Sequence, residues 1–237
     1  MVRTIIAVLI IVVAGWWIFG GTNNKAVAPS ETVMDQIEAS VEDNVSERTV
    51  ITDGEYVVDV ENSIVNWSGK KPLIDGYINS GEISLTDGLI EVSENGATAT
   101  GSFVIDMNTL KVGLTAKKPN METTLEGHLK GDRWFNVEAF PTANFVINKL
   151  TPKADSATTF TYTIEGDLTL KGETHPVSFD AVIYQNADGT IRAEAATEID
   201  RTMWGITAGS ASFFDNLADN AIDNMIALTF TLVATKE

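Results

Sequence analysis

Hydrophobic and polar residues alternate along most of the chain from residue 55 onward. In the last such segment, Ile226, Leu228, Phe230 and Leu232 would share one face of an extended chain. A period of two is typical of β-strands that bury one face. The pattern predicts strands over residues 56–60, 63–70, 78–85, 89–93, 97–107, 143–150, 158–170, 176–185, 191–199 and 225–234.

Turn-forming residues separate these segments. Asn95-Gly96 is the strongest hairpin signal, and Thr86-Asp87-Gly88 is expected to join residues 78–85 to residues 89–93. A helical insertion is expected within residues 121–133, and an irregular stretch within residues 205–224. Few helices are therefore available to cover the apolar strand faces, so we expect an all-β antiparallel sheet that closes into a barrel. A barrel of about eight strands encloses side chains or one small ligand.

The first residues differ from the rest, because no charged residue occurs from Thr4 to Asn24. Such a run can cross a hydrocarbon core of roughly 30 Å. An uncleaved transmembrane helix is favoured over a cleaved signal peptide, since Pro29 directly follows the small residues Ala26-Val27-Ala28. We expect a membrane anchor or signal segment over residues 1–21, an acidic linker over residues 22–54 and the barrel over residues 55–237. The barrel would face the periplasm or the cell exterior, either anchored to the membrane by a single span or secreted after cleavage.

Within the expected linker, Val33, Ile37, Val41 and Val45 recur every four residues, which indicates a weak amphipathic helix. One interpretation is a tether with transient helicity. The other is a helix that docks on the barrel or on a second copy of the chain, which would give a homodimer.

Composition excludes several classes of function. The formal net charge of −17 argues against a nucleic-acid partner, and the absence of cysteine excludes disulfides and thiolate metal sites. The only histidines, His128 and His175, have no acid at a recognisable ligand spacing, so no metal is expected. No nucleophile or phosphate-loop motif is present, and we expect neither an enzyme nor a catalytic cofactor.

Several motifs follow one another in a familiar order. Residues 128–145 join a His-Leu pair to Trp134-Phe135 and to Val-Glu-Ala-Phe-Pro-Thr-Ala, and residues 166–177 read Gly-Asp-Leu-Thr-Leu-Lys-Gly-Glu-Thr-His-Pro-Val. Asp-Arg-Thr-Met-Trp-Gly-Ile follows at residues 200–206, while residues 56–67 and 101–107 supply the opening strands. Together they resemble the YceI-like family from Tyr56 to Lys236. Two departures are Glu126-Gly127 where the family often has Arg-Asp, and Trp134-Phe135 where it usually has two phenylalanines.

The resemblance implies a lipocalin-like antiparallel β-barrel with a short helical crossover and an apolar tunnel. It implies a polyisoprenoid or an acyl lipid as the bound molecule. We therefore expect a non-catalytic, extracytoplasmic binding or carrier protein. The alternative is a surface or stress-related module that uses the barrel as a scaffold for protein contacts.

Candidate ligand-binding residues are the aromatic residues of the barrel and one arginine. For each aromatic residue, plain core packing is the competing interpretation, and Trp204, Phe213 and Phe214 are the candidates for the barrel mouth. For the arginine, the competing interpretation is a salt bridge to Asp200 or Asp106. Lys70 and Lys71 form a positive pair that could attract an anionic headgroup or simply be solvated. The expected ligand-binding residues are Trp67, Phe103, Phe145, Phe160, Tyr162, Phe179, Arg201, Trp204, Phe213 and Phe214.

Overall fold

The structure is a computed structural model that describes residues 49–153 and 161–237. Antiparallel strands dominate it, with one α-helix and three short 3-10 helices within the described residues. In chain order the elements are β1 (Gly54–Val58), β2 (Ile64–Lys70), β3 (Ile78–Ser93), β4 (Thr98–Asp106), η3 (Met107–Thr109), β5 (Lys111–Thr115), α2 (Glu122–Lys130), β6 (Thr142–Pro152), β7 (Thr161–Leu170), β8 (Glu173–Gln185), β9 (Ile191–Asp200), η4 (Arg201–Trp204), η5 (Ala218–Asn220) and β10 (Met225–Lys236).

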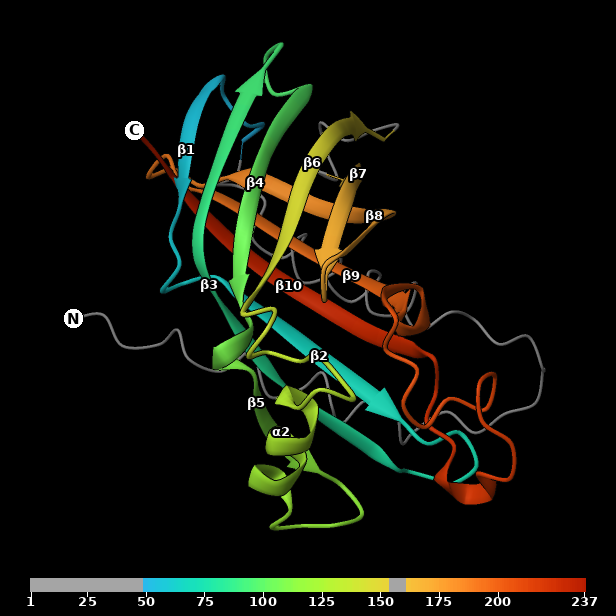
Figure 1. Ribbon diagram of the computed structural model, residues 1–237. Helices are drawn as coiled ribbons and strands as arrows, with labels where there is room; N and C mark the ends of the chain where they lie inside the picture. The colour runs from blue at the N-terminus through green and yellow to red at the C-terminus, as the bar shows by residue number, and fades with distance from the viewer. Residues whose placement is uncertain (1–48, 154–160) are drawn as a thin grey trace, which may run out of the picture.

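The sheet closes on itself, as the alternation predicts. Strands β2, β3, β4, β6, β7, β8, β9 and β10 pair in that order, and β10 returns to pair with β2. The closed outline is visible in Figure 1. Strand β1 continues the position of β2, since it pairs with β10 and β3 beyond the residues that β2 uses. Closure removes the exposed sheet edges and turns one face of every strand inward.

Strand β3 differs from the prediction of two strands with a turn between them. It runs unbroken from Ile78 to Ser93, and its register against β4 shifts between Leu85 and Asp87. The predicted turn at Thr86-Asp87-Gly88 is therefore wrong, and these residues form a β-bulge instead. A Cβ on Gly88 would lie 2.5 Å from Val58 Cγ2 and 2.9 Å from Phe103 Cβ, so the glycine is there for close packing.

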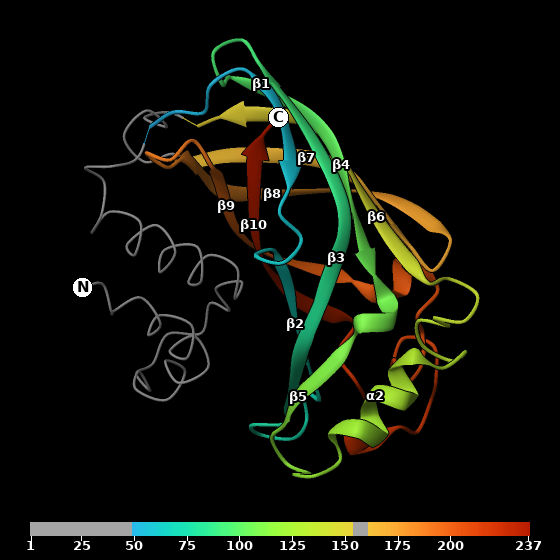
Figure 2. The same ribbon diagram turned by 90° about the vertical axis from the view of Figure 1, so that its left-hand side faces the viewer.

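The barrel is incomplete at one end, which we call the α2 end. There β4 stops at Asp106, η3 turns the chain, and β5 pairs with β3 alone. The sequence pattern missed β5, which is only five residues long. The helix α2 lies against β5, as Figure 2 shows, and falls within the predicted helical insertion.

At the opposite end, called the β1 end, the segment before β1 packs on the strands. Ile51 and Tyr56 are buried, and Thr49 bridges to Gln185. The Tyr56 hydroxyl lies 3.3 Å from Gln185 Nε2 and donates to the carbonyl of Thr52 at 2.8 Å. The chain is thus already packed on the barrel ahead of residue 55, where the sequence places the start of this domain.

The N-terminal apolar run and most of the acidic linker lie outside the described residues, so the expected anchor and linker helix remain predictions. Within residues 49–153 and 161–237, no helix is long and apolar enough to span a bilayer. The predicted irregular stretch is confirmed: residues 205–224 contain the 3-10 helix η5 and otherwise turns and coil.

Candidate functional site: the apolar interior of the barrel

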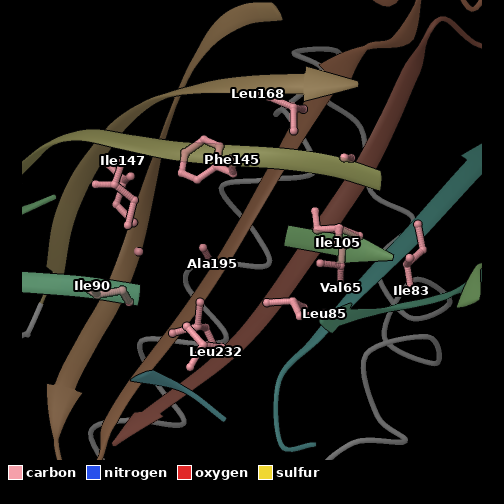
Figure 3. Packing of buried hydrophobic residues seen from close by; sticks show 14 of the residues in the cluster. Val65, Ile83, Leu85, Ile90, Ile105, Phe145, Ile147, Leu168, Ala195 and Leu232 are labelled. Atoms are coloured by element: carbon pink, nitrogen blue, oxygen red, sulfur yellow. The ribbon is translucent and has the colours of Figure 1, made fainter. Parts of the chain in front are cut away.

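The larger cavity lies at the α2 end and has a volume of about 180 Å³. We call it the α2-end cavity. Strand side chains such as Val65, Ile83 and Leu228 form one part of its wall, and Leu125 and Leu129 of α2 form another. Figure 3 shows Val65, Ile83 and Ile105 turned toward one another inside the barrel. An engineered apolar cavity of about 150 Å³ stays dry and binds benzene. A cavity of this size and lining can therefore hold an apolar group.

A second, smaller cavity of about 70 Å³ lies at the β1 end. We call it the β1-end cavity. Its wall is made of strand residues, among them Ile90, Ile147 and Leu232, with Ile51 from the segment before β1. Figure 3 places Ile90, Ile147 and Leu232 around one part of the interior, away from Val65 and Ile83.

A layer of phenylalanine rings lies between the positions that line the two cavities. Phe103 and Phe145 have ring centroids 5.2 Å apart, Phe145 and Phe179 5.7 Å, and Phe179 and Phe230 5.2 Å. We call these four residues the phenylalanine belt. All four line the β1-end cavity, whereas Ile105, Ala143 and Leu228, each two positions away along a strand, line the α2-end cavity.

The belt fits because small residues face it. Gly88 pairs with Phe103, and Ala195 pairs with Phe230. A Cβ on Gly166 would lie 2.4 Å from Phe145 Cζ, so any larger residue at this position of β7 would collide with the ring. Phe103 and Phe145 pair directly across β4 and β6, whereas small residues on β7 and β9, Gly166 and Ala195, lie between the later rings.

Trp67 and the segment after α2 supply the aromatic part of the α2-end cavity. Trp67 lies on β2, and Trp134 and Phe135 follow the helix. A Cβ on Gly81 would lie 1.8 Å from the carbonyl oxygen of Lys111 and 3.0 Å from Trp67 Cε2, so a glycine here lets β3, β5 and Trp67 approach closely. The indole N–H of Trp67 has no acceptor within the described part of the chain. The Trp67 ring lines the cavity with this N–H unpaired among the described residues.

Arg201 lines the α2-end cavity, but its guanidinium donates hydrogen bonds to backbone carbonyls. Only 1% of the residue is exposed. Its guanidinium donates from Nε to Asp223 O at 3.0 Å, from Nη1 to Ile206 O and from Nη2 to Ile222 O at 3.2 Å. Burial lowers the pKa of Arg201, and the charges of Asp200 and Asp223 partly oppose that shift. The guanidinium thereby holds the irregular 205–224 segment against the barrel.

The expected salt bridge of Arg201 to Asp200 or Asp106 is wrong. No carboxylate oxygen of the described residues lies within 4.0 Å of the guanidinium nitrogens. Asp200 instead caps η4 by accepting a hydrogen bond from Thr202 N, and Asp106 caps η3 in the same way through Asn108 N. The face of Trp134 lies 5.2 Å from the guanidinium carbon, which adds a cation–π contact.

Lys70 and Lys71 both line the cavity, close to the irregular segment. Lys70 Nζ lies 3.5 Å from Asp223 Oδ2, and Lys71 Nζ donates to Asn220 Oδ1 at 3.2 Å. Lys71 also lies over the ring of Tyr77, at 4.9 Å from its centroid. The two lysines thus connect the end of β2 to residues 220–223 of the irregular segment.

The aromatic residues predicted from the sequence divide into two groups. Trp67 lines the α2-end cavity, and Phe103, Phe145 and Phe179 line the β1-end cavity. Tyr162 is buried but lines neither cavity, and burial raises the pKa of its hydroxyl. Phe160 lies outside the described residues.

None of the three predicted mouth residues lines the α2-end or the β1-end cavity. Trp204 is 1% exposed and donates from Nε1 to Leu168 O at 3.0 Å, with the edge of His175 packed against its ring. Phe213 and Phe214 are 57% and 44% exposed and line neither cavity. Trp204 is therefore part of the core, because it follows β9 directly in η4, while the two phenylalanines lie on the outer surface of the loop.

Sequence reasoning missed several cavity residues. Phe230 was one of a row of alternating residues on the last strand, and its partners in the belt come from strands far away in the chain. The segment between β5 and β6 completes the wall at the α2 end because β5 pairs with β3 alone. It brings four residues to the cavity: Leu125, Leu129, Trp134 and Phe135. The four-residue spacing of Leu125 and Leu129, which places them on one face of a helix, was the available signal.

Fold and interior together define a small lipocalin-like β-barrel with an apolar, partly unfilled core. The YceI-like domain model matches residues 56–234 of the sequence. The chain therefore belongs to the YceI-like family, as its motifs indicated.

Solved structures share this fold. The chain is similar to BcnA from Burkholderia cenocepacia, with 20% identity, a TM-score of 0.58, and coverage of 75% of this chain and 99% of BcnA. It is also similar to a polyisoprenoid binding domain from Saccharophagus degradans, with 16% identity, a TM-score of 0.53, and coverage of 77% and 98%. A comparison with curated proteins found no match.

Proposed function

We propose that this protein binds a long apolar molecule, a polyisoprenoid or an acyl lipid, in the α2-end cavity and carries it outside the cytoplasm without transforming it. The observation that carries the proposal is the cavity of about 180 Å³ lined mainly by aliphatic and aromatic side chains. An apolar chain gains about 0.8 kcal/mol per CH₂ removed from water. The described structural neighbour from Saccharophagus degradans, a polyisoprenoid binding domain, supports the same ligand class.

The polar groups of the cavity are paired with one another or with the backbone, which supports ligand binding rather than catalysis. Arg201 is held by three carbonyls, and Lys70 and Asp223 form an ion pair with each other. These groups lie on one side of the cavity, next to the irregular segment. A ligand with a polar head and an apolar tail would place the head there and the tail among Val65, Ile83 and Leu129.

The N-terminal residues support the extracytoplasmic part of the proposal. The uncharged run from Thr4 to Asn24 would anchor the chain or direct its export, and the acidic residues before the barrel would hold it away from the bilayer. A carrier in that position would shield an insoluble chain during its passage through water.

The test uses the full chain in phosphatidylcholine nanodiscs and identifies apolar molecules that copurify, by organic extraction and mass spectrometry. Ala143 lines the α2-end cavity and is 2% exposed, so Ala143→Phe fills it. Val146 is on the same strand, points outward and is 42% exposed, so Val146→Phe is the matched control. We expect one apolar species other than the phosphatidylcholine of the nanodiscs to copurify with wild type and with Val146→Phe but not with Ala143→Phe. Equal amounts in all three samples, or none in any, would contradict the proposal.

A further inference from the structure

We propose that the phenylalanine belt sets the length of the apolar chain that the barrel accepts. The inference rests on the proposed function, because it concerns the same cavity. The barrel interior is divided between two apolar cavities, and the belt residues Phe103, Phe145, Phe179 and Phe230 form one wall of the smaller one. A chain that enters at the α2 end meets the rings before it reaches the β1-end cavity.

The belt is a packed layer rather than a set of separate side chains. Consecutive ring centroids are 5.2 to 5.7 Å apart, within the range in which aromatic pairs attract one another. Phe145 is further confined by β7, since Gly166 leaves it no more than the space of a missing Cβ. Removing the Phe145 ring would therefore open the layer between Phe103 and Phe179, while Phe179 and Phe230 keep their contact.

The space beyond the belt would extend the site. The β1-end cavity has a volume of about 70 Å³ and an aliphatic lining that includes Ile147, Ala193 and Leu232. Joined to the α2-end cavity, it would continue the apolar path along the barrel axis. With the belt in place, a ligand tail gains contacts only up to the rings, so longer chains gain no affinity.

The critical variant is Phe145→Ala, which opens the belt at its most confined ring. The matched control is Ile147→Ala, two residues further along β6, which enlarges the β1-end cavity but leaves the belt intact. Because Phe145→Ala could fail to fold, Phe179→Leu serves as a second variant that removes a ring and keeps most of the volume. Near-ultraviolet circular dichroism would verify the fold of each.

Geraniol, farnesol and geranylgeraniol are suitable probes, since each is one isoprene unit longer than the one before. Titration calorimetry would use the full chain in phosphatidylcholine nanodiscs, with empty nanodiscs subtracted. For wild type and Ile147→Ala we expect affinity to stop rising before geranylgeraniol. For Phe145→Ala we expect an affinity for geranylgeraniol about tenfold above that of wild type, with geraniol unchanged, because the added methyl and methylene groups become buried.

Two outcomes would overturn the inference, and they are distinguishable. If wild type binds the probes but its affinity rises through the whole series, or Phe145→Ala and Phe179→Leu keep its length profile, the belt does not set the length. If wild type binds none of the three probes, the proposed function itself fails and the belt inference fails with it.

Discussion

The two ends of the barrel are built in different ways, and the difference determines where space remains. At the β1 end, β1 fills the position between β10 and β3, and the Thr52–Tyr56–Gln185 hydrogen bonds hold the adjacent segment. At the α2 end, β5 pairs with β3 alone, and a helix and an irregular loop complete the wall. The cavity at the β1 end, where strands pair regularly, has a volume of about 70 Å³. The cavity at the α2 end, where a helix and a loop complete the wall, has a volume of about 180 Å³. The end with less regular secondary structure is the end that can hold a ligand.

The largest effect should come from Arg201, which joins the irregular segment to the barrel. Arg201→Met leaves three carbonyls of Asp223, Ile206 and Ile222 without their donor, and we expect a loss of about 3–5 kcal/mol in the free energy of unfolding. Urea denaturation of the full chain would measure it.

Arg201→Lys tests whether the charge of this side chain or the planar geometry of its guanidinium stabilises the fold. A lysine keeps the charge but lacks the planar fork, so we expect it to be nearly as destabilising as methionine. Hydrogen exchange should accelerate at residues 205–224 and stay unchanged at the β1 end. A lysine variant as stable as wild type would show that the charge, and not the geometry, matters at this position.

The next effect should come from the β1 end. Gln185 Oε1 accepts from Thr52 N at 3.2 Å, and Nε2 donates to Gly189 O at 2.9 Å. Gln185→Ala removes both hydrogen bonds from partly buried backbone groups, and we expect about 1 kcal/mol of destabilisation with no change in farnesol affinity. A large loss of affinity would mean that the two ends do not act separately.

A smaller, pH-dependent effect is expected at α2. Glu126 accepts from Lys130 Nζ at 2.9 Å and from Val112 N of β5 at 3.4 Å. The hydrogen bond from Lys130 is the main cause that lowers the pKa of Glu126 below its ordinary value of 4.5. A lowered pKa means that the ionised form is favoured in the fold, so the stabilisation is present above that ordinary pKa and is lost as pH falls through the folded pKa.

The measurement is the difference in unfolding free energy between wild type and Glu126→Gln as a function of pH. We expect wild type to be more stable by about 0.3–0.5 kcal/mol near neutral pH, the usual value of such a helical pair, and the difference to vanish in acid. Lys149→Gln is a useful control, since its contact with Glu165 spans 3.9 Å between exposed side chains on β6 and β7. A difference that grows in acid would contradict the sign of the shift.

The smallest effect should come from Phe214, which the sequence analysis placed at the mouth. Its side chain is exposed and lines neither cavity, so Phe214→Ser should change stability by less than about 0.5 kcal/mol and leave farnesol affinity unchanged. A large drop in affinity would return this residue to the binding site.

The same contrast explains what the sequence could predict. Alternation located the strands that build the closed barrel, because each inward residue is two positions from the next. It could not show that β3 passes through Asp87-Gly88 without turning, since a bulge and a hairpin turn use the same residue types. It also could not assemble the phenylalanine belt, whose members come from β4, β6, β8 and β10 and meet only after closure.

Arg201 and Trp204 illustrate the opposite difficulty. Both lie at the edge of an irregular stretch, where the sequence suggests an exposed mouth. Their hydrogen bonds to the carbonyls of Ile206, Ile222 and Leu168 draw them into the interior instead. Such side-chain to backbone contacts depend on the path of a loop, and no periodicity encodes that path.

The central claim is that the α2-end cavity holds an apolar chain, and a crystal structure of the full chain with farnesol would test it most directly. The account predicts continuous electron density inside the barrel, between Trp67 and Leu129, that ends at the phenylalanine belt. An α2-end cavity filled by protein side chains or by ordered water, with farnesol bound only outside the barrel, would contradict it.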